Sequence, residues 1–297
     1  MTSVITVPAS LDEESFEQVL DQLAPLPADA KLLVDARHCR FATPAGLTSL
    51  LCLAQSRIEK PDFAPPTDEN VQSYWARSAF FKYAEELFTF RGTVLRPRAQ
   101  QNIDAVLEVT PIARNEDVQA IVDHVKDRAT HILTTKLRLE ARATMGFAMS
   151  LSEACQNVVE HAGRGGWVAV QVYDWTKRRV GRNVVVISVA DAGQGFRRSL
   201  ETSRARALAG DRWNDGEALE AALTQGHSRH AEPGRGQGLK GIKGYVHRYD
   251  GSLSIRSGTA RITKLPSWDT GEPRVEGLSP FTGAQLQIVI PERAGDA

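Results

Sequence analysis

Leu151-Ser-Glu-Ala-Cys-Gln-Asn-Val-Val-Glu-His-Ala162 is the stretch that most strongly constrains the fold. Its apolar residues recur at helical spacing, so we expect a helix over 151–162 with one buried face. Glu153, Asn157 and His161 follow at steps of four, which places a carboxylate, an amide and an imidazole along a second stripe. Asn157 could supply an oxygen to Mg²⁺, and Glu153 could orient or deprotonate a nucleophile. For this segment alone, a solvated helix face is the alternative.

A strand that ends in an acidic, glycine-bearing turn follows the helix. Residues 183–190 are a nearly continuous run of β-branched residues, which is typical of a strand buried on both faces. The run ends in Asp191-Ala-Gly193-Gln-Gly195, where a fixed acceptor lies beside glycines that let a ligand approach the backbone. The amino group of a purine would suit that acceptor. A turn that only caps the strand is the alternative.

A second glycine-rich segment, Pro233-Gly-Arg-Gly-Gln-Gly-Leu239, leads into apolar residues at helical spacing. It predicts a loop that feeds a helix N-terminus, where backbone N–H groups bind phosphates well. It matches neither a P-loop nor a dinucleotide-binding fingerprint. A flexible surface loop is the alternative.

The three boxes together resemble those of the Bergerat-fold, or GHKL, nucleotide-binding domain of gyrase, Hsp90, histidine kinases and MutL. The resemblance is closest to bacterial anti-sigma-factor serine kinases, whose helix reads Ser-Glu-Ala-x-x-Asn-x-x-x-His, as residues 152–161 do here. It covers residues 105–292 and implies an α/β sandwich with a mixed sheet. The closing strand at 283–291 is also similar, except that Ala284 stands where the family usually has Thr beside the adenine.

The resemblance implies ATP and Mg²⁺ as cofactors and assigns a role to each box. Glu153 would be the catalytic base, Asn157 would hold Mg²⁺, and Asp191 would read the adenine amino group. The glycines of the third box would form a lid over the phosphates. The expected ATP-binding set is Asn157, His161, Asp191, Gly193, Gly195, Gly234, Gly236, Gly238 and Leu239.

Residues 1–95 resemble a STAS domain, the anti-sigma-antagonist fold, which is also α/β. Residues 31–36 read as a strand, and residues 41–47 open an apolar helix in which Thr43 is the expected N-cap and Pro44 belongs to the first turn.

The STAS-like turn lacks the Ser that is usually phosphorylated in that family. Either Thr43 substitutes for it, or the domain docks without being phosphorylated. We favour the second, because a hydroxyl used as an N-cap is already engaged. Residues 71–83 are expected to form one aromatic helix that completes this domain.

The composition limits the class of protein and its partners. A chain of 297 residues with 42% hydrophobic residues can form two cores, and the polar, basic stretch at 91–104 is the expected boundary. The 36 basic and 36 acidic residues balance, so we expect neither nucleic acid nor a membrane as a partner. Three scattered cysteines and the lack of an apolar run of about 18 residues favour the cytoplasm.

Among activities that an ATP site permits, two are disfavoured. A histidine autokinase needs a helical hairpin before the ATP domain, and only one long helix fits between 116 and 138. A gyrase-like ATPase needs a transducer domain, for which the residues after Pro291 leave no room. We therefore expect a serine/threonine protein kinase that acts on a STAS-type or sigma-factor-type regulator, with a homodimer left open. The alternative is an ATP-gated interaction switch or a weak ATPase.

Overall fold

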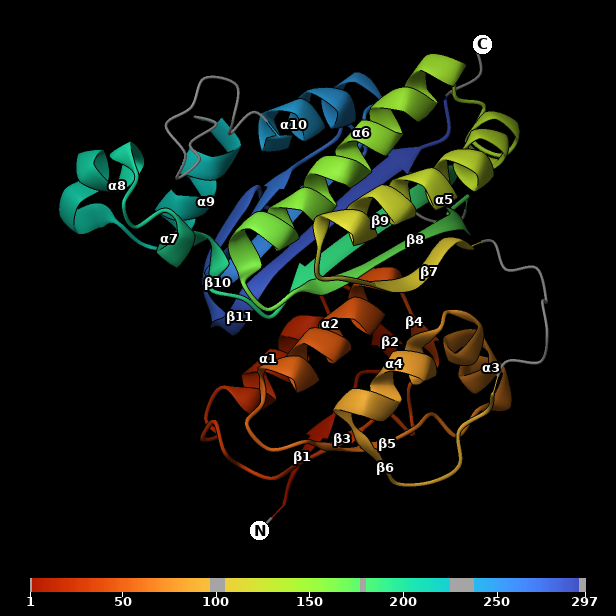
Figure 1. The fold of residues 1–297 in the computed structure, drawn as a ribbon, viewed down its shortest axis with the longest axis vertical. Helices are drawn as coiled ribbons and strands as arrows, with labels where there is room; N and C mark the ends of the chain where they lie inside the picture. Colours follow the sequence, from red (N-terminus) through yellow and green to blue (C-terminus); the bar gives the residue numbers. More distant parts are fainter. Residues whose placement is uncertain (1, 97–104, 177–179, 225–237, 294–297) are drawn as a thin grey trace.

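The chain folds into two α/β regions, each built on its own sheet (Figure 1). The computed structural model describes residues 2–96, 105–176, 180–224 and 238–293. We call residues 2–96 the N-terminal region and residues 105–293 the C-terminal region. No helix in these ranges is long and apolar enough to cross a membrane.

The N-terminal region contains a parallel sheet with strand order β1-β3-β5-β6 and a small parallel pair, β2-β4. Helices connect the parallel strands, as such strands require. The elements are β1 (Ser3–Thr6), β2 (Ser10–Leu11), α1 (Phe16–Leu23), β3 (Leu32–Asp35), β4 (Phe41–Ala42), α2 (Pro44–Ser56), β5 (Asp62–Ala64), α3 (Glu69–Arg77), α4 (Phe80–Leu87) and β6 (Thr89–Phe90).

The C-terminal region contains a sheet with strand order β10-β11-β9-β8-β7. Its elements are β7 (Ala105–Ile112), α5 (Asn115–Thr135), α6 (Ala141–Asn157), the π-helical turn η1 (Val158–Ala162), β8 (Gly166–Asp174), β9 (Asn183–Asp191), α7 (Gly195–Ser199), α8 (Arg204–Ala209), the 3-10 turn η2 (Gly210–Arg212), α9 (Asp215–Thr224), α10 (Gly238–Arg248), β10 (Ser252–Lys264) and β11 (Arg274–Pro291).

The expected mixed sheet in the C-terminal region is wrong. Every strand pair of the described sheet is antiparallel. The connections explain this arrangement. The links from β8 to β9 and from β10 to β11 are direct, whereas two antiparallel helices, α5 and α6, join β7 to β8. Because α5 and α6 run in opposite directions, they return the chain to the end of the sheet at which β7 finished, so β8 runs antiparallel to β7.

The two faces of the C-terminal sheet are covered by different parts of the chain. Helices α5, α6 and α10 cover one face, and the N-terminal region, with α1 and α2 foremost, covers the other (Figure 1). The first face shares a core with these three helices. The second shares a core with the N-terminal region, to which the sheet contributes Val109, Trp167, Ala169, Ala190 and Phe281. The sheet is therefore the middle layer of three.

Several expected elements are confirmed. The strand expected over 183–190 is β9, and the helix expected over 151–162 is the end of α6 with η1. Thr43 is the N-cap of α2, because its Oγ1 accepts a hydrogen bond from the Gly46 N–H at 3.3 Å. Pro44 occupies the first turn, where a missing N–H costs nothing.

The single aromatic helix expected over 71–83 is wrong. The segment divides into α3 and α4, because Ala79 adopts a left-handed conformation with φ +61° and interrupts the helical path. The Ser78 carbonyl, released from a continuous helix, accepts a hydrogen bond from the Val109 N–H of β7 at 3.0 Å. The aromatic side chains form a core, in which Trp75 and Phe80 are fully buried.

Candidate functional site

A cavity of about 570 Å³ lies between α6, α10, the end of β9 and the middle of β11. Its volume is within the range of roughly 300–1,000 Å³ that is usual for small-molecule sites. The sequence-predicted residues that line it are Glu153, Asn157, His161, Asp191, Gly195, Gly238 and Leu239. Three segments that are separated in sequence thus meet at one cavity, as the three boxes predicted.

Helix α6 and the following π turn supply the polar residues on one wall. Glu153 and Asn157 lie on α6, one helical turn apart, whereas His161 lies in η1. The wider π turn changes the angular step after Asn157, so the regular four-residue ladder ends there. His161 nevertheless lines the cavity. The π turn is a difference from the regular helix that the spacing predicted, and such turns are frequent at functional sites.

Asn157 has hydrogen-bonding capacity that the protein leaves unused. Its Nδ2 is buried and finds no hydrogen-bond partner among the described residues. Asn157 also lines the cavity. Its Nδ2 is a hydrogen-bond donor, so only the amide oxygen could face a cation. The described residues contain no group of three or more His, Cys, Asp or Glu that could hold a metal by itself. Mg²⁺ usually takes one or two ligands from protein and the rest from phosphate and water, so a single amide oxygen is compatible with such a site.

Asp191 ends β9 and is only 8% exposed. Its Oδ1 accepts a hydrogen bond from the Gly193 N–H at 2.8 Å, and the backbone N–H of Ala284 also donates to the carboxylate. Burial raises the pKa of Asp191 to about 6, and these two hydrogen bonds oppose the rise. At neutral pH the carboxylate is thus a buried, mostly ionised acceptor at the wall of the cavity.

Ala284 pairs directly with Asp191 across β9 and β11 and lines the cavity. The position where the resembling family usually has Thr is therefore adjacent to the acceptor, but the side chain here is a methyl group. Nucleotide binding by this site has to proceed without a hydroxyl from that position.

The two glycines after Asp191 have different tasks. Gly193 does not line the cavity. It packs against η1, since a Cβ at Gly193 would lie 2.5 Å from the Ala162 Cα. Gly195 has φ +72° and lines the cavity, and a Cβ there would lie 2.7 Å from Ser257 Oγ. Gly193 thus positions the loop, and Gly195 permits a backbone conformation that other residues rarely adopt.

The N-terminus of α10 faces α6 across the cavity. A Cβ on Gly238 would collide with the Glu153 carboxylate, so the absence of a side chain lets the first turn of α10 approach that group. The N-terminus of an 11-residue helix carries partial positive charge and favours anions. The other two glycines of the third box, Gly234 and Gly236, lie outside the described residues.

Contacts between α6 and α10 hold this arrangement together. A Cβ on Gly146 would lie 2.6 Å from the Tyr245 ring, so the two helices pack closely there. The Tyr245 hydroxyl donates a hydrogen bond to the Ala143 carbonyl at 3.0 Å. Leu239, Ile242 and Val246 are buried, as the helical spacing predicted.

The apolar wall of the cavity was not predicted from the sequence. Phe196, Leu200, Met149 and Tyr245 line it together with the polar residues. Phe196 directly follows Gly195, so its place at the site could have been predicted from the motif at 191–195. Met149 lies one turn before Glu153 and is 63% exposed, and its place at the site depends on the packing of α10, which local sequence does not show.

Residues 145–275 match the family described as histidine kinase-, DNA gyrase B-, and HSP90-like ATPase. The match includes the polar residues of the cavity from Glu153 to Asp191 and the first turn of α10. The C-terminal region thus contains a GHKL-type ATPase domain, which confirms the coarse part of the expected resemblance. No curated protein matches the chain.

Proposed function

We propose that the GHKL-type ATPase domain binds ATP with Mg²⁺ in this cavity and transfers the γ-phosphoryl group to a serine or threonine of a separate protein. The observation that carries the proposal is the convergence of three groups. The Asp191 carboxylate, the Asn157 side-chain amide and the N-terminus of α10 line one cavity. These groups suit the amino group of a purine, a phosphate-bound cation and the phosphates themselves.

Three residues of the cavity have separate roles in the proposed reaction. Asp191 would accept a hydrogen bond from the adenine, and Asn157 would hold Mg²⁺ through its amide oxygen. The cation, when bound, neutralises charge on the phosphates. Glu153 would orient the partner's hydroxyl and accept its proton, while the bond from the γ-phosphorus to ADP breaks and a bond to the hydroxyl oxygen forms.

The N-terminal region supports a regulatory role in this proposal. We treat residues 1–95 as a STAS-like domain and residues 105–292 as the ATPase domain, which act on a STAS-type or sigma-factor-type regulator. Thr43 is 4% exposed and serves as an N-cap, which supports docking without phosphorylation at this turn. The cysteines of the chain are free and buried, which suits the reducing cytoplasm that we propose as its location.

An ATP-gated interaction switch is the second candidate. It is favoured by the contact between the N-terminal region and the sheet that carries Asp191. Helix α2 packs on β9 and β8, and its Ser49 accepts a hydrogen bond from Gln285 Nε2 at 2.6 Å, one residue from Ala284. A nucleotide could therefore change the N-terminal region's docking without any transfer of phosphate.

Radiolabelled ATP separates the two candidates. The purified chain is incubated with Mg²⁺ and ATP labelled at the γ-phosphate, with and without cell extract. Asn157→Ala and Glu153→Gln are compared with the exposed controls Asn70→Ala and Glu116→Gln. For a kinase, label moves to a protein in the wild type and both controls, and transfer falls at least about a hundredfold in Glu153→Gln.

ATP binding is measured on the same samples by titration calorimetry. Retained binding without transfer in the wild type contradicts the kinase proposal and leaves the switch. If the wild type does not bind ATP at all, both candidates are wrong.

A further inference from the structure

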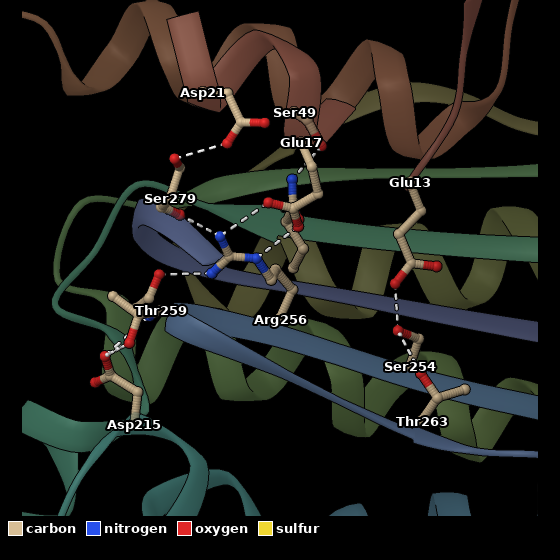
Figure 2. Close-up of polar contacts among 12 residues, drawn as sticks. Glu13, Glu17, Asp21, Ser49, Asp215, Ser254, Arg256, Thr259, Thr263 and Ser279 are labelled. Carbon is tan, nitrogen blue, oxygen red and sulfur yellow. Dashed lines mark hydrogen bonds and ion pairs between the residues drawn. The ribbon is translucent and has the colours of Figure 1, made fainter. Parts of the chain in front are cut away.

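A fully buried arginine joins the two regions of the molecule. Arg256 of β10 is 0% exposed, and its guanidinium forms a two-pronged ion pair with Glu17 of α1, at 2.8 Å and 3.1 Å (Figure 2). Nη1 donates to the Gly258 carbonyl at 2.5 Å, and Nη2 donates to the Ser279 carbonyl of β11. One side chain thus holds α1 against both strands of the β10–β11 pair.

Arg256 lies where the pairing of β10 with β11 is irregular. The register shifts at Ser257/Gly258 and again at Gly258/Ala260, and Gly258 has φ +60°. Such a bulge disrupts the ladder and turns backbone groups away from it. On its other side the bulge is attached to the start of α9, since Asp215 Oδ2 accepts hydrogen bonds from the N–H and the hydroxyl of Thr259, both at 2.9 Å (Figure 2).

The residue after the arginine contacts the loop that carries the cavity wall. Ser257 Oγ accepts a hydrogen bond from the Phe196 N–H at 3.1 Å and donates one to the Gly283 carbonyl at 2.7 Å. Phe196 and its neighbour Gly195 line the cavity, and Gly283 precedes Ala284. Arg256, which pairs with Glu17 of the N-terminal region, is therefore adjacent in sequence to Ser257, which holds the backbone at Phe196 and at Gly283 near the cavity.

We propose that Arg256, held by Glu17, is a positioning residue for the nucleotide site, so that docking of the N-terminal region and binding of ATP favour each other. Glu17 fixes the Arg256 side chain, Arg256 fixes the bulge, and Ser257 on that bulge fixes the backbone of Gly195 and Phe196. A group that adds binding energy only when two parts are both ordered couples those parts, and the coupling is reciprocal. The inference rests on the proposed ATP binding.

The first test compares two contacts between the regions, of which only the first is linked to the cavity through Arg256 and Ser257. Glu17→Gln keeps the shape of the side chain but removes the charge that holds Arg256. Tyr74→Phe is the matched control, because the Tyr74 hydroxyl donates to Gln171 of β8 at 2.5 Å and so joins the same two regions away from the bulge. We expect calorimetry to show ATP binding weakened about fivefold or more in Glu17→Gln and unchanged in Tyr74→Phe.

The second test uses hydrogen exchange and a variant that leaves the ion pair intact. Ser257→Ala removes the contact to Phe196 while Glu17 and Arg256 keep theirs. In the wild type, ATP should slow amide exchange in α1. In Ser257→Ala that response should disappear, although α1 exchanges as slowly as in the wild type before ATP is added.

Amide hydrogen exchange in the nucleotide-free protein tests the positioning role of Arg256 without depending on ATP binding. Glu17→Gln should speed exchange at residues 195–200 of the nucleotide-free protein, whereas Tyr74→Phe should not. Unchanged exchange there, or an equal loss of ATP affinity in both variants, would overturn the inference while leaving ATP binding intact. A wild type that fails to bind ATP would instead overturn the proposed function, and the exchange at 195–200 would still report on the positioning role.

Discussion

The two faces of the C-terminal sheet are both covered, but their polar groups are satisfied in different ways. On the face under α6 and α10, the Asn157 amide nitrogen has no partner in the described chain, and Asp191 is buried at a cavity. On the face under the N-terminal region, Arg256 pairs with Glu17 and Gln285 pairs with Ser49. Unsatisfied buried groups destabilise a fold. The cavity face carries the candidate site, whereas the paired groups of the other face join the two regions.

The largest expected effect breaks the interface face. Glu17→Ala leaves the Arg256 charge buried without its partner, which should lower the free energy of unfolding by about 3–5 kcal/mol. Urea denaturation followed by circular dichroism measures this change. Glu14→Ala, an exposed glutamate of the same segment, should change stability by less than about 0.5 kcal/mol.

A double replacement sharpens the same point. Glu17→Leu combined with Arg256→Met removes both charges, so much of the stability lost in Glu17→Ala should return. If the two variants are equally unstable, the ion pair itself is not what holds this part of the interface.

The next effect concerns the cavity face, where function and stability should change in opposite directions. Asp191→Asn should weaken ATP binding roughly ten- to a hundredfold, because a charged acceptor becomes a neutral amide. The same change should raise the free energy of unfolding at pH 8. Between the ordinary pKa of 3.8 and the folded pKa of about 6, the folded state binds more protons, so stability falls as pH rises through this window.

The cost of ionising Asp191 in the fold is about 3 kcal/mol at most, from the size of its pKa shift. Asparagine avoids that cost but offers one acceptor oxygen fewer to the N–H groups of Gly193 and Ala284. We therefore expect a gain of roughly 1–2 kcal/mol in urea denaturation. A variant that is less stable than the wild type at pH 8 and still binds ATP normally would contradict both parts.

A smaller effect is the pH dependence of ATP binding. Because the pKa of Asp191 is raised to about 6, the carboxylate becomes protonated below that pH and loses its full strength as an acceptor. Affinity should fall below pH 6, by up to about tenfold per pH unit. Fluorescence titration with an ATP analogue between pH 5 and pH 8 measures it. The phosphates of the nucleotide titrate as well, so the pH dependence of affinity in Asp191→Asn gives their contribution. If affinity changes with pH equally in the wild type and in Asp191→Asn, the Asp191 carboxylate is not the group responsible.

The smallest effect tests a neutral pair on the interface face. Thr48 Oγ1 and Ser188 Oγ lie 3.1 Å apart, and Thr48 also donates to the Pro44 carbonyl at 2.9 Å. Thr48→Val should cost about 1 kcal/mol, because the buried Ser188 hydroxyl loses its contact with Thr48. Ser188→Ala should cost less, and the double variant should cost less than Thr48→Val alone. Additive losses would show that the two hydroxyls do not act as a pair.

The parts of the site that could be predicted from sequence are those fixed by short motifs. Glu153 and Asn157 lie one helical turn apart, Asp191 ends a run of β-branched residues, and Gly238 begins a helix with an apolar face. Each prediction needed only local spacing. The π turn at His161 and the break at Ala79 were missed, because each depends on tertiary contacts that outweigh the local preference for a regular helix.

The interface could not be predicted from the strand pattern. Ser252, Ser254 and Arg256 alternate with Leu253 and Ile255, and alternation of this kind is typical of a strand with one face in water. In the structure all five side chains are buried, since Glu13 before α1 accepts a hydrogen bond from Ser254 and Glu17 of α1 pairs with Arg256. Nothing in β10 alone shows that a second polar surface, more than two hundred residues earlier in the sequence, covers it.

The three buried thiols lie where their alkylation rates can measure the opening of different parts of this molecule. Cys39 and Cys52 belong to the core that the N-terminal region shares with the sheet, and Cys155 belongs to the core under α6. Burial raises the pKa of all three, so an alkylating reagent can reach a reactive thiolate only when the surrounding packing opens. Cys52 on α2 should react when the N-terminal region separates from the sheet, and Cys155 only when the ATPase core opens. The two labelling rates therefore report undocking and unfolding as separate events in the unmodified protein.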